Sequence, residues 1–184
     1  MKNRPGFTLI EVVLVIVLTG ILSSVIIPVL LQAVLSMHYH QTRTAVVSSC
    51  RVSMDRLGME IRRIRSAADI TTMTSGSIAF TDVAGNTITA NVQDGDTDDA
   101  DELRLVYNGA ASILSTFVDQ FTFTYYDSDG VVIDHSDADA AERLRTVRMT
   151  GRFSPVGDNM FDQPYDLTTE VRPPNLVSEE AILP

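Results

Sequence analysis

Glu11 is the residue of this chain whose type and position most need a chemical explanation. It precedes a stretch in which the 26 positions from Val12 to Met37 contain no charged residue. About 20 apolar residues suffice for a helix to cross the hydrocarbon core of a membrane, and a helix satisfies its own backbone hydrogen bonds there. An ionised carboxylate beside such a segment is costly unless it meets a cation. Glu11 is therefore expected to pair with a positive group; the alternative is that it only marks the membrane interface.

The residues before Glu11 favour a role in processing and assembly. An ordinary signal peptide has its small-residue cleavage site after the apolar region, whereas Gly6 stands before that region and follows a short basic leader. Together with the leader, the apolar run and Pro28, one hexapeptide resembles the N-terminal signal of the type IV pilin and pseudopilin family. Its sequence is Gly6-Phe7-Thr8-Leu9-Ile10-Glu11.

The resemblance implies a route of maturation. In that family a membrane aspartic peptidase, the prepilin peptidase, cuts after the glycine and N-methylates the new first residue. Here the cut falls between Gly6 and Phe7, so that Glu11 becomes the fifth mature residue. The family's glutamate is thought to pair with the N-terminal amine of a neighbouring subunit. The resemblance thus implies processing at Gly6 and Phe7 and assembly through Glu11 and Pro28. The implied partners are other pilin or pseudopilin subunits and an inner-membrane assembly platform.

A run of carboxylates in the second half of the chain suggests calcium. Asp94, Asp96 and Asp98 match the first three ligand positions of an EF-hand. However, Asp99 stands where the loop needs glycine, and Leu105 stands where it needs glutamate. The pattern therefore favours a solvated acidic loop, with a looser calcium site left open as the alternative. No other cofactor is expected.

The remaining candidate groups do not form a catalytic or metal-binding pattern. His38 and His40 point to nearly opposite sides of a helix and cannot both ligate one zinc ion, so they are expected to be interface residues. Asp134–Asp139 is a weaker calcium candidate, and its His135 gives no serine or cysteine a plausible base. Cys50 is the sole cysteine, so no internal disulfide can form, and we expect it to be buried. The sequence predicts no enzyme.

Charge indicates the compartment. The 184-residue chain has a net charge of −10, and without the leader it has twelve arginines against 24 acidic residues. Such a surface does not favour nucleic acid or anionic lipid. The leader holds Lys2 and Arg4, and the next basic residue is Arg43. The positive-inside rule places the leader in the cytoplasm. We expect a single-pass inner-membrane protein with a periplasmic or extracellular head that later enters a fibre.

The apolar pattern predicts that the helix continues beyond the membrane. Seven residues at alternating spacings of three and four form one seam: Val47, Cys50, Met54, Leu57, Ile61, Ile64 and Ala68. Three pairs spaced i,i+4 are expected to add weak ion pairs: Arg51–Asp55, Arg56–Glu60 and Arg65–Asp69. Gly20 and Pro28 interrupt the membrane half. A tolerated kink and a local melt that lets the helix stretch are both consistent with this proline.

Short alternating segments after residue 70 predict strands. They cover residues 77–83, 86–92, 103–107, 121–126, 131–133, 144–152 and 165–171. Turns are expected at Ala84-Gly85 and at residues 127–130. One antiparallel sheet packed on the seam gives an α+β, pilin-like fold. The expected divisions are a leader (1–6), a transmembrane and assembly helix (7–37), an amphipathic helix (38–69) and a β-rich head with a proline-containing tail (70–184).

Two segments suggest a subclass. Met54–Arg62 and Val118–Asp127 look most like J-type minor pseudopilins and W-type minor pilins. The resemblance implies a non-enzymatic subunit of a type IV pilus-like or type II secretion pseudopilus fibre. The alternative is an adhesive or ligand-binding tip module on the same stem, and a membrane-tethered enzyme is the third interpretation.

Overall fold

The computed structural model describes residues 8–93, 101–154 and 164–176. It divides into two compact units, Met1–Thr42 and Arg43–Pro184, which are considered separately below. Helix α1 (Leu9–Ile61) contributes its first part to one unit and its last part to the other. We call the second unit the head.

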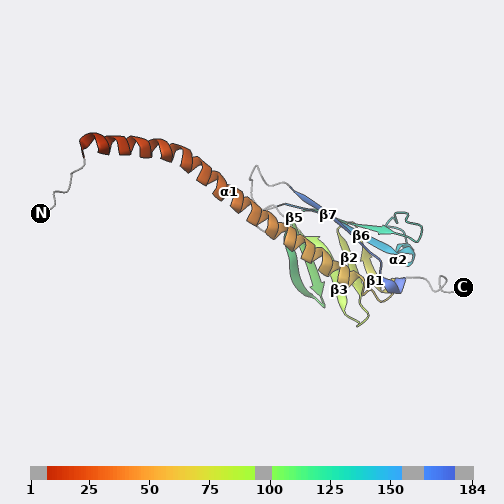
Figure 1. The fold of residues 1–184 in the computed structure, drawn as a ribbon. Helices are drawn as coiled ribbons and strands as arrows, with labels where there is room; N and C mark the ends of the chain where they lie inside the picture. The colour runs from red at the N-terminus through yellow and green to blue at the C-terminus, as the bar shows by residue number, and fades with distance from the viewer. Residues whose placement is uncertain (1–7, 94–100, 155–163, 177–184) are drawn as a thin grey trace. The chain divides into compact units, whose positions relative to one another are not determined.

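The head combines the end of α1 with an antiparallel sheet, which confirms the predicted α+β class (Figure 1). The strands are β1 (Ile70–Met73), β2 (Ser77–Thr81), β3 (Thr87–Gln93), β4 (Asp101–Tyr107), β5 (Ala110–Tyr126), β6 (Thr146–Phe153) and β7 (Tyr165–Val171). The short helices are η1 (Ala67–Asp69), α2 (Ala140–Arg143) and η2 (Pro174–Leu176).

The seven strands follow one another in the sheet in the order of the sequence. Strand β5 joins the two halves of the sheet because it is 17 residues long. Its first part pairs with β4, from Tyr107 opposite Ala110 to Asp101 opposite Val118. Its second part pairs with β6, from Val118 opposite Phe153 to Tyr126 opposite Thr146.

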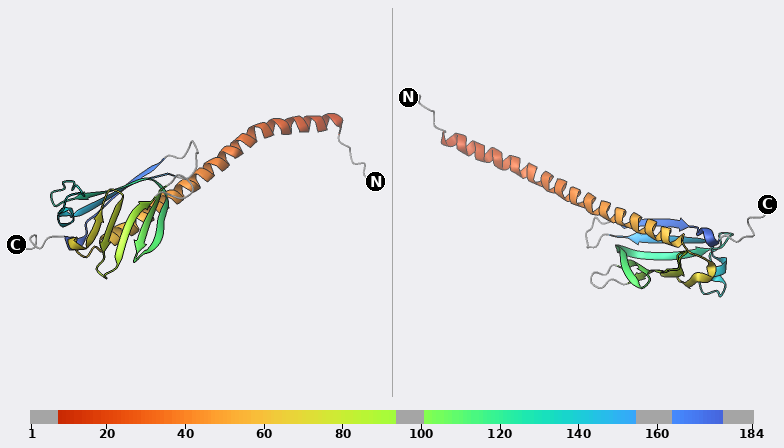
Figure 2. Two further views of the ribbon diagram at one scale, coloured as in Figure 1. Left: turned by 180° about the vertical axis from the view of Figure 1, so that it is seen from behind. Right: turned by 90° about the horizontal axis from the view of Figure 1, so that it is seen from below.

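The last part of α1 lies across one face of the sheet (Figures 1 and 2). Its inward side chains are Val46, Cys50, Met54, Leu57 and Ile61, and all are buried in the core with residues such as Ile78, Phe80, Val147 and Met149. Burying one large aliphatic side chain contributes about 1.5–3 kcal/mol. The predicted seam is therefore confirmed from Cys50 to Ile64, whereas Val47 is only half-buried.

Gly58 allows α1 to approach β7 closely. A Cβ atom at this position would lie 3.3 Å from Cγ2 of Val171, which is tighter than an ordinary van der Waals contact. This glycine lies within Met54–Arg62, one of the two segments that suggested a subclass. The glycine in that segment thus has a structural reason, which is the close packing of α1 against β7.

The helix ends at Ile61, whereas the predicted helix reached residue 69. The backbone N–H groups of Arg63 and Ile64 donate to the carbonyls three residues earlier, which tightens the chain into a turn. Ile64 then forms a β-bridge with Asp82, and its side chain stays in the core. Ala68 is exposed, so its inclusion in the seam was wrong. The three- and four-residue spacing of apolar residues thus predicted the burial of Ile64 correctly, although helix α1 ends before this residue.

Three predicted strands differ clearly from the structure, and the first is the one predicted at 121–126, because β5 already begins at Ala110. The segment 131–133 contributes only one bridge, between Tyr126 and Val132, because Ile133 then enters the core. The predicted strand at 144–152 begins at Thr146 instead, since Leu144 closes helix α2. The hairpin turn at Ala84-Gly85 is confirmed, with Gly85 at a φ of 85°, a conformation that favours glycine.

Candidate assembly site

The first unit presents an apolar helix. Residues Leu9–Met37 are long and apolar enough to cross a membrane, and their large apolar side chains are exposed. The hydroxyls of Thr19 and Ser24 donate to the carbonyls of Val15 and Ile21, both at 2.7 Å. These polar side chains are thus satisfied within the helix. Lipid or other apolar helices are the environments that suit this surface.

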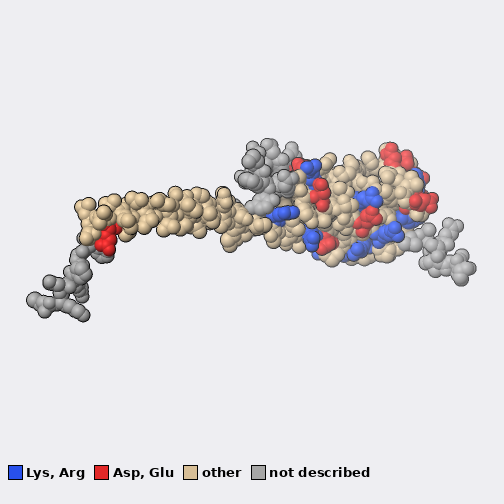
Figure 3. Space-filling model, turned by 45° about the horizontal axis from the view of Figure 1, so that its top comes forward, with Lys and Arg blue, Asp and Glu red and all other residues tan. Residues whose placement is uncertain are grey.

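Glu11 lies in the first turn of this helix and points back toward its beginning. The backbone N–H and the hydroxyl of Thr8 both lie 3.5 Å from Oε2 of Glu11. This is a loose form of the capping box, in which a glutamate three residues into a helix reaches back to the first turn. The helix dipole favours a negative group at this end. On the face drawn in Figure 3, acidic atoms occur along the apolar helix only near its beginning.

The predicted processing residues Gly6 and Phe7 lie outside the described residues. The processing at Gly6 and Phe7 and the pairing of the Glu11 carboxylate with an amine therefore stay predictions. Glu11 is exposed within the single chain. Its expected partner, an amine on a neighbouring subunit, is a group outside this chain.

Pro28 lies inside α1, and the chain remains helical on both sides of it. Proline has no N–H to donate to the carbonyl of Ser24, four residues earlier. In this state the helix accommodates the missing hydrogen bond without ending. That favours a tolerated proline here, and its role in assembly stays a prediction.

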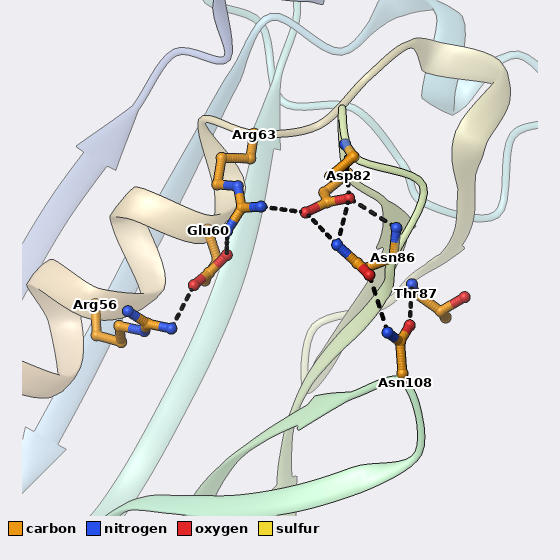
Figure 4. Close-up of polar contacts among 8 residues, drawn as sticks. Arg56, Glu60, Arg63, Asp82, Asn86, Thr87 and Asn108 are labelled. Carbon is orange, nitrogen blue, oxygen red and sulfur yellow. Dashed lines mark hydrogen bonds and ion pairs between the residues drawn. The ribbon is translucent and has the colours of Figure 1, made fainter.

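A polar cluster fixes the other end of α1 to the sheet (Figure 4). The Glu60 carboxylate is almost fully buried; it forms an ion pair with Arg56 at 2.8 Å and accepts a hydrogen bond from Arg63 at 3.0 Å. Arg63 also pairs with Asp82, which lies just after β2 and is fully buried. Two buried carboxylates thus share Arg63 between the helix end and the β2–β3 hairpin. Such buried charges are tolerated because each one is paired and hydrogen-bonded.

Asp82 organises the hairpin turn as well. Its Oδ1 accepts hydrogen bonds from the backbone N–H groups of Ala84 at 2.9 Å and Asn86 at 2.7 Å. Burial alone would raise the pKa of Asp82, but the hydrogen bonds from Asn86 and Ala84 and the charge of Arg63 together lower it. Asn108 extends the cluster to the β4–β5 turn by donating to the side-chain oxygen of Asn86 at 2.9 Å. These contacts hold the end of α1 and the two turns in fixed positions, so the cluster is best suited to making the head rigid.

Of the three predicted helical ion pairs, the structure forms two. Arg56 pairs with Glu60 as expected, and Arg65 pairs with Asp69, although Asp69 lies in η1 rather than on the same helix. Arg51 forms no ion pair with Asp55 within the described part of the chain, so that prediction was wrong. The Arg63–Asp82 pair was not predicted.

The calcium candidates are only partly described. Asp94, Asp96, Asp98 and Asp99 lie outside the described residues. In the second candidate, Asp134 accepts hydrogen bonds from Ser136, and Asp137 and Asp139 pair with Arg143. Among the described residues, no group of three or more His, Cys, Asp or Glu side chains could hold a metal ion.

Cys50 lies on the inward side of α1 and is buried in the core, as expected. Burial raises the pKa of its thiol to about 11, so the thiolate that would react is scarce at neutral pH. Cys50 is therefore suited to packing rather than to chemistry. The side chain of His38, one of the two predicted interface histidines, lies outside the described residues.

Comparison with known proteins bears on the N-terminal segment. The model of one family, the prokaryotic N-terminal methylation motif, matches residues 1–27. The chain carries a type IV prepilin-like signal. The matched residues include Gly6, Phe7 and Glu11, while Pro28 lies one position beyond them. No curated protein matches the chain. The signal supports a type IV pilin-like or pseudopilin-like subunit, and the apolar helix is compatible with single-pass membrane anchoring.

Proposed function

We propose that the protein is a minor pilin or pseudopilin, a structural subunit that enters a type IV pilus-like or type II secretion pseudopilus fibre. It is inserted in the inner membrane, cut by prepilin peptidase after Gly6 and methylated at Phe7. The observation that carries this proposal is the prepilin-like signal over residues 1–27 together with an apolar helix whose large side chains are exposed among the described residues. Its partners are other pilin-type subunits and an inner-membrane assembly platform.

The minor subclass rests on the head. Met54–Arg62 contains Gly58 and Glu60, which fit α1 against β7 and bind the arginines at the helix end. Val118–Asp127 forms the second half of β5 and pairs with β6. Both segments thus take part in holding the head together, the first through helix packing and the second through strand pairing. The subclass itself is supported by the resemblance of these two segments.

An adhesive or ligand-binding tip module on the same stem is the second candidate. The exposed side chains that favour it lie in the loop between β5 and β6, where Val131 and Val132 stand among carboxylates. A tip module would carry its ligand site on the head and would stand at one end of the fibre. A shaft subunit would use the same side chains for contact with neighbours.

The processing step tests the proposal directly. The full-length protein is purified from cells with and without an active prepilin peptidase, and its N-terminus is determined by mass spectrometry. The proposal predicts a chain that begins at Phe7 and is one methyl group heavier than the unmodified segment. Gly6→Ala and Gly6→Val give a graded control, because the larger side chain should block the cut more strongly. An intact Met1 terminus in cells with active peptidase contradicts the proposal.

A further inference from the structure

The outward side of α1 in the head carries apolar side chains between arginines. Val52 and Met59 are 65% and 51% exposed. They lie seven residues apart, about 10 Å along the helix, on the side opposite the buried Met54. Arg51 and Arg62 flank them and are also exposed. We call Arg51, Val52, Met59 and Arg62 the arginine ridge.

The arginine ridge has positive charge that the described part of its own chain does not neutralise. Between Arg43 and Arg65 the sequence holds six arginines and two acidic residues. Arg56, Arg63 and Arg65 pair with carboxylates of the same chain. Arg51 and Arg62 form no ion pair among the described residues. An exposed apolar centre beside arginines resembles the composition of protein interfaces, which are enriched in Met and Arg.

The loop between β5 and β6 carries the opposite charge around its own apolar centre. Val131 and Val132 are 56% and 57% exposed. Asp129 and Glu142 are exposed, and their side chains make no hydrogen bond or ion pair within the described part of the chain. Arg143 ties the two sides of this loop together through an ion pair with Asp127 at 3.6 Å. We call Asp129, Val131, Val132 and Glu142 the valine loop.

The two surfaces complement each other in charge and in apolar content. Residues 127–145 hold six acidic residues and two arginines, which makes the valine loop negative where the arginine ridge is positive. The ridge lies on the outer side of α1, and the loop lies between the end of β5 and the start of β6, whose positions are drawn in Figure 1. A head therefore offers two complementary patches.

We infer that the arginine ridge of one copy binds the valine loop of a second copy. Two different patches in contact make a heterologous interface. Opposite charges set the orientation of the two heads, and the apolar pairs are removed from water. This inference rests on the proposed function, because it names the head surface through which a fibre subunit contacts its neighbour.

Site-specific cross-linking of full-length chains tests the contact. Two copies with different tags are produced together, one with Met59→Cys and the other with Val132→Cys, and membranes and fibres are treated with a short bismaleimide. Cys50 stays in place because it is buried and its thiol pKa is raised. The expected product joins the two tags, at a yield at least about fivefold above that of chains with Cys50 alone, whose background is set by a poorly reactive thiol.

Matched variants distinguish a docked pair from random collision. Ile113→Cys replaces Val132→Cys in the control, since Ile113 is 52% exposed and belongs to neither patch. Equal yield with Ile113→Cys, or an adduct of Met59→Cys with a different protein in its place, overturns the inference.

Charge reversal supplies a second measurement without disturbing the described contacts within the head. Arg51→Glu with Arg62→Glu in the Met59→Cys copy should lower the adduct yield about fivefold, as expected for loss of exposed ion pairs. Adding Asp129→Arg and Glu142→Arg to the Val132→Cys copy should restore it. Failure of the restoration overturns the inference. The N-terminus of the same chains is determined in parallel: methylated Phe7 without the adduct defeats this contact alone, whereas an intact Met1 defeats the proposed function.

Discussion

Arg63 donates to the fully buried carboxylate of Asp82 at 2.5 Å, and this ion pair joins the end of α1 to the β2–β3 hairpin. The helix ends two residues before Arg63, so the pair forms where the chain leaves the helix and bridges to Asp82. Ion pairs thus hold α1 to the sheet at this end of the head, and apolar packing holds it at the centre. Both features can be tested on a head fragment.

The head fragment beginning at about His38 should be soluble and folded. Its apolar seam is covered by the sheet, whereas the exposed apolar stretch Leu9–Met37 is left out. Circular dichroism should show both helix and strand. A purely helical or a disordered spectrum contradicts the fold.

Asp82→Asn should destabilise this fragment by about 1–3 kcal/mol, because it removes a charged hydrogen-bond acceptor from a buried site and leaves Arg63 with less compensation. The measurement is the free energy of unfolding from urea titration. Asp129→Asn is the matched control, since Asp129 is exposed; it should change the free energy by less than about 0.5 kcal/mol. Equal effects of the two changes would show that the buried pair contributes nothing specific.

The stability of the head should fall as the solution is acidified below about pH 4. The hydrogen bond from Arg65 first, and then that from Ser66, lower the pKa of Asp69 to about 2, and the pKa of Asp82 is lowered as well. A carboxylate whose folded pKa is depressed stabilises the fold above its unfolded pKa, near about 4, and loses this contribution as pH falls through the folded value. Urea midpoints between pH 5 and about 2 should therefore decline less steeply for Asp69→Asn with Asp82→Asn. An unchanged slope contradicts the assignment.

Gly151→Ala should cost the head about 1–3 kcal/mol through overpacking. A Cβ atom there would lie 2.5 Å and 2.6 Å from the ring of Phe153 and 3.1 Å from that of Phe121. Gly76→Ala is the matched control, because a Cβ atom at Gly76 meets nothing within 4 Å. Thermal unfolding should show a lower midpoint for Gly151→Ala alone. Similar midpoints for both variants would mean that the Phe153 ring moves aside at no cost.

Much of the fold of the head could be predicted from the spacing of apolar residues. Cys50, Met54, Leu57 and Ile61 lie in the core because three- and four-residue spacing places them on one side of a helix. The turn at Gly85 could be predicted from its residue type between two alternating segments.

Other features depend on contacts that spacing does not encode. The first part of β5 includes Ala110 and Ser112, which lack the alternation of a strand, and it is held by pairing with β4. It is also held by Ser53, whose hydroxyl lies 2.6 Å from the carbonyl oxygen of Leu114. The Arg63–Asp82 pair joins residues 19 apart and exists only once the chain has turned. Sequence patterns report periodicity, and these contacts arise from the tertiary fold.

The incorporation of Glu11 variants into fibres tests the central claim most directly. Glu11→Gln keeps the size of the side chain and removes the charge, so processing and insertion should survive, while the attraction to a neighbour's amine is lost. Glu11→Val should behave in the same way, and Glu11→Asp, which keeps the charge, is the matched control. The measurement is the fraction of each processed variant in sheared fibres relative to membranes. We expect Glu11→Gln and Glu11→Val to remain in membranes and Glu11→Asp to retain part of its incorporation; fibre incorporation of Glu11→Gln equal to that of the unaltered protein would contradict a role for this charge in assembly.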